Sequence, residues 1–511
     1  MMPINSREFE IKLLFPGGKF ELIEKWIISK GGLQRQHLRA AYIDTPDFLF
    51  AQAGISFRLR KEGRQWMQTL KVSTDKPLER LEHNVILGAT GNTIPKWDLD
   101  LHHHDKTGKL LEKQFPKIKN EDLQISYRAD VWRRRAVVNT GQGVLEYALD
   151  KGSIYSQLPN GERIIPVQEL EIEIMEGDPR DVLKHAQNMI KRYGAFIDTR
   201  SKSERGYLLA CGLEFSPPIR AKSILLKKVR GDHEIICHLI YSCMEQVLGN
   251  QNVLNAECKN YSEYLHQMRV GLRRLKVLFK YLAKWDIYIS DHGIDVFNKV
   301  FAKLGQYRDN DYVVRTLNPT LLSLGGSEIK LDDITGLPNP SHITREKEFQ
   351  LLLVELMTAG LSPAVLISDS KGGKNSKEGA VTIKKTVGKL LNSRFSFISD
   401  QASQFLTLQD EAIHSIRKKM KFMRYSMEFF RDYCVQKAYP KFYKSLSVTL
   451  DLFGLFNDIC VAIDRIEGLL QNDPNLLFAL GWLKAERQRV RSLCGKSLKK
   501  LVQMTFPWGS K

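Results

Sequence analysis

The feature that most constrains this sequence is a set of strand-like runs in which charged and apolar residues alternate. In the first run, EFEIKLLF (8–15), Glu8, Glu10 and Lys12 occupy every second position. Alternate side chains of a β-strand share one face and lie about 7 Å apart. Two carboxylates at that distance repel by about 2 kcal/mol at an effective dielectric constant of about 20. A solvated sheet face explains one such strand, so the other strand-like runs must show whether the charges have a further role.

Six later runs repeat the alternation: GISFRLRKE, WMQTLKV, EHNVIL, VWRRRAVVN, VLEYALD and QELEIEIM. When each run is phased by its apolar residues, both signs of charge recur on the hydrophilic face. The charged positions are Arg58, Arg60, Lys71, Glu82, Arg133, Arg135, Glu146, Asp150, Glu169, Glu171 and Glu173. The recurrence predicts one shared charged surface, which becomes a water-filled lumen if the sheet closes into a barrel.

Helical patterns divide the chain. Two of them interrupt the strands, at 19–32 and at 178–194, where Asp178 suits an N-cap, Pro179 the first turn and Gly194 the end of the helix. After the SPP break at 216–218 long helical patterns dominate, with loops expected at 324–341 and 368–380. The break predicts a domain boundary.

Charge distinguishes the two parts. Residues 1–215 hold 33 basic and 29 acidic side chains, whereas residues 216–511 hold 44 and 29. The basic surplus of the second part predicts a polyanionic partner such as nucleic acid, an acidic membrane or polyphosphate.

Cysteine usage and hydropathy predict a cytoplasmic protein without a membrane span. The seven cysteines are scattered and include no C-x-x-C pair, which indicates reduced thiols. The most hydrophobic stretch, 351–367, is interrupted by Glu355 and Pro363. Association with polyphosphate granules is a further expectation for such a protein if it binds polyphosphate.

The mixed charges of the strands suit a phosphate substrate and a divalent cation. Arg and Lys donate charge-assisted hydrogen bonds to phosphate oxygens. Paired carboxylates bind Mg²⁺ or Mn²⁺, which also bridge phosphate oxygens and orient water. The run LHHHDK (101–106) is another candidate metal site, but adjacent positions rarely converge on one ion, so we interpret it as a solvated loop.

Glu8, Glu10 and Lys12 match the E-x-E-x-K signature of the CYTH superfamily, the triphosphate tunnel metalloenzymes. The similarity continues through 42–72 with R-L-R and T-L-K, ALDKG (148–152), ELEIEI (169–174) and RSKSERGY (200–207). E-x-E-x-K alone occurs often by chance, whereas the ordered set is specific. The first two hundred residues thus resemble this superfamily, which implies an antiparallel tunnel barrel that hydrolyses the terminal phosphate of a triphosphate.

The resemblance implies a role for each matching position. Divalent metal, Mg²⁺ or Mn²⁺, would be held by Glu8, Glu10, Glu171 and Glu173, which with Lys12 form the catalytic set. The triphosphate would be bound by Lys12, Arg58, Arg60, Lys71, Arg133 and Lys202. Further candidates for metal binding, water positioning or support are Glu82, Asp150 and Glu169. Arg135 joins the substrate-binding set or balances charge.

The helical part carries two basic stripes at helical spacing, each beside an apolar seam. The first comprises His266, Arg269, Arg273, Lys276 and Lys280, and the second comprises His414, Arg417, Lys421 and Arg424. Their leading histidines are 148 residues apart, and the motifs LGQYRDND and FGLFNDIC, with Asp309 and Asp458, recur 149 residues apart. The nearly constant offset predicts an internal duplication and hence two similar helical bundles.

A solvated helix face explains a single basic stripe, and helix packing explains its histidine. However, His begins both stripes and acids are nearly absent from them. H-x-x-R-V-x-x-R-R-L (266–275) and MRYSMEFF (423–430) also resemble the CHAD domain, a helical module often fused behind CYTH. This resemblance implies that the two stripes bind inorganic polyphosphate.

We therefore expect an α+β protein with a CYTH tunnel barrel and flanking helices at 1–214, a linker at 215–222, and an all-α CHAD domain of two pseudo-symmetric bundles at 223–508. The expected activity is metal-dependent hydrolysis of inorganic triphosphate to pyrophosphate and phosphate. Alternatives are a thiamine triphosphatase, a class IV-type adenylate cyclase, or a nonenzymatic scaffold for polyphosphate or nucleic acid. Nucleic acid is disfavoured because single-strand binders interleave aromatic with basic residues.

Overall fold

The computed structural model describes residues 5–74, 78–88, 91–226, 229, 231–285, 287–330, 337–361, 383–471 and 473–508. The chain forms two compact units. The first comprises 1–219, 244–259 and 344–361, and the second comprises 220–243, 260–343 and 362–511. The domain bounds given above stay a prediction.

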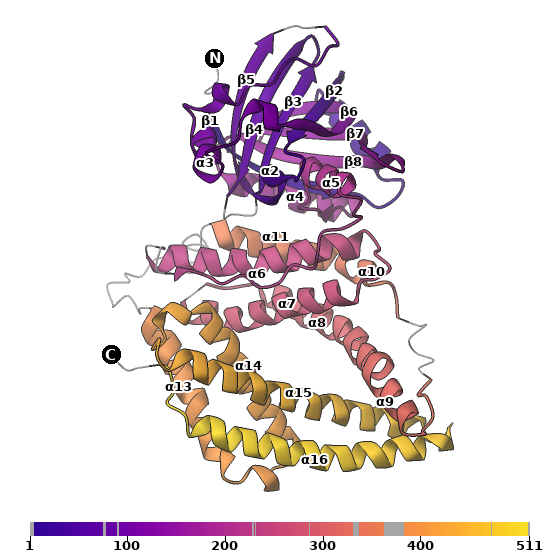
Figure 1. Ribbon diagram of the computed structural model, residues 1–511, viewed down its shortest axis with the longest axis vertical. Helices are drawn as coiled ribbons and strands as arrows, with labels where there is room; N and C mark the ends of the chain where they lie inside the picture. The colour runs from indigo at the N-terminus through magenta and orange to yellow at the C-terminus, as the bar shows by residue number, and fades with distance from the viewer. Residues whose placement is uncertain are drawn as a thin grey trace. The chain divides into compact units, whose positions relative to one another are not determined.

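The first unit is built on an antiparallel sheet that closes on itself (Figure 1). Its strands are β1 (Asn5–Leu14), β2 (Arg35–Asp44), β3 (Ile55–Glu62), β4 (Gln65–Ser73), β5 (Glu79–Gly88), β6 (Gln124–Asn139), β7 (Val144–Leu158), β8 (Gly161–Glu176) and β9 (Phe196–Ile197). Among the described residues the order is β5-β4-β3-β2-β6-β7-β8-β1, and β1 also pairs with β5. The predicted barrel is therefore confirmed.

The apolar faces of the strands point outward and are covered by helices. Phe57, Leu59 and Leu70 pack in a buried cluster with Leu111 of α3 (Lys106–Gln114). The outer wall is also covered by α1 (Phe20–Ser29) on β6 and β7 and by α4 (Pro179–Tyr193) on β1 and β8. In contrast, α5 (Lys202–Ala210) contacts β6 and β7 from the side of the interior, where its residue Lys202 lines the cavity. Burial of apolar surface stabilises this arrangement by about 25 cal/mol per Å². The charged residues between the apolar ones therefore line the interior.

The alternating pattern predicts most of the barrel strands. All seven runs are strands, and the second helical pattern is α4, with Asp178 accepting a hydrogen bond from the Arg180 N–H and Gly194 in the left-handed region at a φ of 68°. The alternating pattern does not predict β2. The reason is that its inward positions include Leu38 and Ala40, so β2 lacks the alternation of charged and apolar side chains.

The interpretation of LHHHDK as a solvated loop is wrong for His102. This residue ends a short 3-10 helix (Leu99–His102) and is fully buried, whereas His103 and His104 are exposed. Its Nδ1 lies 2.8 Å from His83 Nδ1, and its Nε2 lies 3.0 Å from Gln68 Nε2. Burial and the neighbouring His83 lower the pKa of His102 to about 4, so this ring is neutral and part of the packing.

Outside the sheet, the described residues are mainly helical. The helices are α2 (Leu49–Gln52), α6 (Asp232–Asn255), α7 (Ser262–Leu282), α8 (Asp291–Tyr312), α9 (Asn318–Ser323), α10 (Pro340–Thr344), α11 (Lys347–Leu361), α13 (Ile383–Ala402), α14 (Asp410–Phe429), α15 (Tyr439–Leu469) and α16 (Leu477–Val502). In the second unit α7 packs on α8 and α14 packs on α15 (Figure 1). The two pairs also contact each other, α7 with α14 and α8 with α15. This arrangement confirms the helical fold, with paired helices at the duplicated motifs.

Among the described helices, α15 is long and apolar enough to cross a membrane, with a mean hydropathy of 1.7. It packs against α14 and α16 and buries Phe453, Phe456 and Ile463. The cytoplasmic location stays a prediction. The predicted loop at 368–380 and part of the one at 324–341 lie outside the described residues.

Candidate active site in the barrel

The barrel encloses a cavity of about 720 Å³. It is lined by 13 of the 14 site residues that the sequence predicts in this unit: Glu8, Glu10, Lys12, Arg58, Arg60, Lys71, Glu82, Arg133, Arg135, Asp150, Glu171, Glu173 and Lys202. The fourteenth, Glu169, is fully buried and bonds to the cavity residue Lys202. The sheet and α5 (Lys202–Ala210) thus bring all 14 together, while their individual roles stay predictions.

Strand register explains why the acids gather on one wall. In the β1–β8 pairing Glu10 lies opposite Glu173 and Lys12 lies opposite Glu171. In the β7–β8 pairing Glu146 lies opposite Glu173. Directly opposed side chains in an antiparallel pair lie about 5 Å apart. Carboxylates on three neighbouring strands therefore converge.

One set of carboxylates lacks full charge compensation. Glu8, Glu10 and Glu173 offer oxygen atoms that all lie within 4.8 Å of one another, and we call them the open carboxylate group. Glu8 accepts hydrogen bonds from Lys71 Nζ at 2.7 and 2.8 Å, and Glu10 lies 3.6 Å from Arg80 Nη1. Within the described part of the chain Glu173 has no ion pair. The group therefore has room for a positive charge.

The electrostatics of the open carboxylate group agree with this geometry. Burial, together with the charges of Glu8 and Glu10, raises the pKa of Glu173 to about 8. Burial outweighs the charge of Lys71 and raises the pKa of Glu8 to about 7. Ionisation of both carboxyl groups is thus unfavourable, and a bound cation would favour their ionised forms.

A second set of carboxylates is already neutralised. Asp150, Glu169 and Glu171 also lie within 4.8 Å of one another, and we call them the paired carboxylate group. Lys202 Nζ lies 2.6, 2.5 and 2.9 Å from their respective oxygens, and Arg133 lies 2.6 Å from both Asp150 and Glu171. Two further cations contact the group: Lys12 and Arg205. These carboxylates orient the basic residues of the cavity.

The pKa values distinguish the two groups. Burial alone raises the pKa of Glu169, but the charges of Lys12, Lys202 and Arg205 outweigh it and hold the pKa at about 2. The pKa of Glu171 is likewise held well below its usual range by Lys202 and Arg133 against the effect of burial. The metal set implied by the resemblance is therefore divided in the structure: Glu8, Glu10 and Glu173 are together, and Glu171 lies among cations.

The substitution Lys202→Met is expected to destabilise the barrel by about 3–5 kcal/mol, because it leaves buried carboxylates without their cation. Glu169 and Glu171 have lowered pKa values, so their contribution to the free energy of unfolding is present above a pH near 4.5 and is lost as the pH falls below that value. The destabilisation should therefore be full at pH 7. Urea unfolding measures it, with the exposed Lys25→Met as the matched control. Equal midpoints for the two variants would contradict the pairing.

The wall formed by β3 is cationic. Arg58 and Arg60 both project into the cavity, and the Nε atom of each is buried without a hydrogen-bond partner among the described residues. Arg60 pairs with Glu62. Burial and the charges of Arg58 and Arg133 lower the pKa of Arg60, which shows that cations crowd this wall. Buried donors of this kind need an acceptor, and an anion bound in the cavity would supply one.

Two charged residues at the site escape the sequence analysis. Arg80 lines the cavity 3.6 Å from Glu10, and Arg205 donates a hydrogen bond to the buried Glu169. Arg80 and Glu82 are two positions apart in ERLEH, so the strand period of two already places Arg80 on the same face as Glu82. Arg205 follows Lys202 on α5, a helix that the strand pattern does not reveal.

In the second unit the two basic stripes converge. Arg273 of α7 and Arg417 of α14 both act on Lys421, and with burial they lower the pKa of Lys421 to about 6. Arg273 also lowers the pKa of Arg417, after burial. We call Arg273, Arg417 and Lys421 the basic cluster. Cations held this close need a polyanion or an acid beside them.

The remaining predicted stripe residues lie on the same two helices, α7 and α14, and differ in burial. Arg269 is buried and donates to the Phe301 carbonyl, Lys276 donates to Asn298, and Arg424 lies over Tyr425. The other members are His266, Lys280 and His414. Burial lowers the pKa of both histidines, so each is neutral at pH 7. Sequence analysis misses Arg308 and Arg394, which lie on other helices of the unit.

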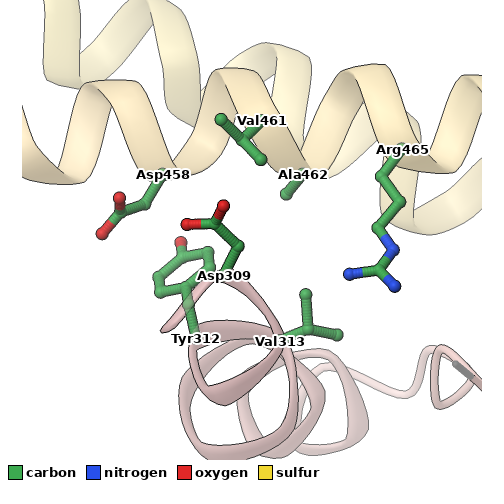
Figure 2. Close-up of a pocket in the computed structure, with 7 residues that line it drawn as sticks. All are labelled: Asp309, Tyr312, Val313, Asp458, Val461, Ala462 and Arg465. Carbon is green, nitrogen blue, oxygen red and sulfur yellow. The ribbon is translucent and has the colours of Figure 1, made fainter. Parts of the chain in front are cut away.

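The duplicated aspartates lie beside the basic cluster. Figure 2 shows Asp309 of α8 and Asp458 of α15 facing each other, with Tyr312 and Arg465 at the same pocket. Arg308 Nη2 lies 3.8 Å from Asp458. Burial raises the pKa of both aspartates against the charges of the surrounding arginines. Residues 149 positions apart in the sequence thus occupy matching places, as the duplication predicts.

Comparison with known proteins agrees with these observations. The family model for the CYTH domain matches residues 6–207, and the model for the CHAD domain matches residues 238–467. An inorganic triphosphatase of Haemophilus influenzae is 26% identical over 179 residues, which is 34% of this chain. The match spans about half (47%) of the length of that curated relative.

Two solved structures are also similar. The crystal structure of the CHAD domain from the plant Ricinus communis is 21% identical, covers 57% of this chain and 98% of that chain, and gives a TM-score of 0.42. A candidate adenylate cyclase from Bacillus halodurans is 22% identical, covers 40% of this chain and 98% of that chain, and gives a TM-score of 0.28. The two matched models together extend over most of the sequence, and the chain belongs to the proteins that join a CYTH domain to a CHAD domain.

Proposed function

We propose that the barrel hydrolyses inorganic triphosphate to pyrophosphate and phosphate with the help of a divalent cation. One observation carries this proposal: among the described residues, a single cavity holds a carboxylate group with incomplete charge compensation, in which Glu173 has no ion pair, and two buried guanidinium Nε atoms without an acceptor, those of Arg58 and Arg60. A metal–triphosphate complex brings both missing partners. The similarity of the chain to an inorganic triphosphatase supports the choice of reaction.

The open carboxylate group fits Mg²⁺ or Mn²⁺. These hard cations are bound through one or a few carboxylates, while phosphate oxygens and waters complete the coordination shell. Glu8, Glu10 and Glu173 would hold the ion, which would offset phosphate charge and make a water more acidic.

The basic residues would bind and orient the substrate. Arg58 and Arg60 have buried donors for the phosphate oxygens, and Lys12 lies between the two carboxylate groups in the register of β1. In the reaction a water oxygen bonds to the terminal phosphorus, and the bond from that phosphorus to the bridging oxygen breaks. Pyrophosphate leaves with the charge that develops on the bridging oxygen, and fixed cations stabilise that charge.

The helical unit is proposed to bind polyphosphate through the basic cluster and the surrounding stripes. Its aromatic rings near the stripes are already covered by cations: Arg269, Arg273 and Lys276 lie over Phe301, and Lys280 and Arg394 lie over Phe422. A ring covered in this way is not free to stack on a nucleobase. The arrangement therefore favours polyphosphate over nucleic acid.

The proposed reaction is tested by phosphate release from tripolyphosphate, ATP and thiamine triphosphate, assayed side by side with the full chain. We expect tripolyphosphate to be preferred, activity with Mg²⁺ or Mn²⁺, and none with a chelator. Preference for thiamine triphosphate, formation of cyclic AMP from ATP, or full activity in the chelator would overturn the proposal.

A further inference from the structure

A second cavity lies on the outer wall of the barrel and plays no part in the proposed reaction. It measures about 490 Å³ and is formed by α1, α4 and the outward faces of β6 and β7. Small-molecule sites occupy cavities of about 300–1,000 Å³. The strand alternation separates it from the barrel interior, because Tyr147 lines this cavity while its neighbour Glu146 lines the interior.

The walls of the outer cavity are aromatic. Tyr147 is fully buried, and its hydroxyl is hydrogen-bonded to Nδ1 of His185. Trp26 meets Tyr147 edge to face, with 4.9 Å between ring centroids, and Tyr193 lies at the end of α4. Trp26 is only half-buried, so it offers an accessible aromatic surface against which a planar ligand ring can lie.

The rim of the outer cavity is cationic. Lys30, Lys191 and Arg192 are exposed and line the cavity, and none of them has an ion pair in the part of the chain that the structure describes. The Arg192 guanidinium lies 5.2 Å from the centroid of the Tyr193 ring, so an anion beside it would also lie near an aromatic wall. The nearest buried acid, Asp181, accepts from the Thr140 hydroxyl and lies 3.8 Å from His185 Nε2. Charge complementarity therefore calls for an anionic ligand.

A neutral polar group completes the site. Asn188 lies on α4 between His185 and Lys191 and lines the cavity. Its side-chain amide offers both a donor and an acceptor, the pair that recognises the edge of an adenine ring. Aromatic walls, one amide and three cations are the chemical complement of a base attached to phosphate groups.

We propose that this outer cavity binds a nucleotide, with the base against the Trp26 wall and the phosphates at Lys191 and Arg192. The proposal is independent of the reaction in the barrel, because none of these residues contacts the interior cavity. Lys30 would add a third contact to the phosphates from α1.

Equilibrium dialysis of radiolabelled ADP against the full chain tests the proposal. The buffer contains a chelator, which removes the divalent cation that the barrel would need to bind a phosphate chain. We expect about one ADP bound per chain. The double variant K191E/R192E and the cavity-filling variant N188W should each weaken ADP binding by about tenfold or more, a loss of about 1.4 kcal/mol. The matched control K184E changes an exposed lysine of α4 outside the cavity and should bind ADP like the wild type.

All substituted positions are exposed, so equal melting temperatures and equal tripolyphosphate hydrolysis are expected for every variant. Displacement of ADP by pyrophosphate as effectively as by unlabelled ADP would show that the base is not recognised, and it would overturn the proposal. The absence of bound ADP at a concentration of about 1 mM, where a Kd of 1 mM corresponds to a binding free energy of about −4 kcal/mol, would also overturn the proposal. Equal ADP binding by the wild type, both cavity variants and K184E would overturn it as well.

Discussion

The substitution Glu173→Gln is expected to reduce metal-dependent hydrolysis of tripolyphosphate by at least about a hundredfold, because it removes a charged ligand from the ion that stabilises the transferring phosphoryl group. The amide has nearly the shape of the carboxyl group, so the barrel should remain folded. Phosphate release at saturating Mg²⁺ or Mn²⁺ measures the effect. The matched control is Glu176→Gln, an exposed carboxylate at the end of the same strand, which should keep wild-type activity.

The same variant has a second expected signature, in stability. The pKa of Glu173 is about 8 in the folded protein and near 4.5 in the unfolded chain, so between these values the folded state holds the extra proton. The free energy of unfolding of the wild type should therefore fall as the pH rises from about 4.5 to 8. In chelator, Glu173→Gln should melt higher than the wild type at pH 8 and similarly at pH 5. A variant that keeps wild-type turnover, or melts lower at pH 8, would remove Glu173 from the open carboxylate group.

Charge reversal in the helical unit is expected to have a comparably large effect on polyphosphate binding. Arg273→Glu combined with Arg417→Glu removes two cations of the basic cluster and adds two repulsive charges. Because hydrogen bonds to charged groups contribute about 1.5–3 kcal/mol each, affinity should fall by at least about a hundredfold. Fluorescence anisotropy with labelled polyphosphate measures it. Hydrolysis of tripolyphosphate by the barrel should be unchanged.

The control for this experiment is Lys437→Glu, an exposed lysine away from both stripes, which should bind polyphosphate like the wild type. Lys421 adds a pH dependence. Its pKa is about 6 in the free protein, and a bound polyanion raises it, so binding takes up a proton above pH 6 and affinity should fall as the pH rises. Equal affinity of the charge-reversal variant, or tighter binding of an oligonucleotide than of polyphosphate, would reverse the assignment of this unit.

The barrel could be predicted from sequence because its interior is charged. Glu8, Glu10 and Lys12 alternate with buried Phe9 and Ile11, so the phase of β1 is visible without any structure. Where the inward residues are small or apolar, as in β2, the same rule gives no signal. The pattern is thus most informative at the strands that carry the site.

The division of the acids into two groups could not be predicted. Glu171 and Glu173 are two positions apart on β8 and look equivalent in ELEIEI. Their difference depends on Lys202 and Arg133, which come from α5 and β6 and contact Glu171 but not Glu173 in the described residues. Only the register of β6, β7 and β8 and the packing of α5 determine which of the two carboxyl groups has a cation beside it.

The outer cavity could not be predicted from the sequence either. Trp26, Tyr147 and Arg192 come from three separate segments, and each alone is typical of a helix or strand that packs on a barrel. Helix α4 is evident from its N-cap and its terminal glycine, but the face that it leaves uncovered depends on where α1 packs.

The most direct test of the account is the anomalous scattering of Mn²⁺ in crystals of the full chain. The account predicts a peak in the barrel at about 2.0–2.2 Å from carboxylate oxygens of Glu8, Glu10 and Glu173, the distance expected for a small hard cation. A peak among Asp150, Glu169 and Glu171 with Lys202 displaced, or a barrel that takes up no manganese while tripolyphosphate is still hydrolysed, would contradict it.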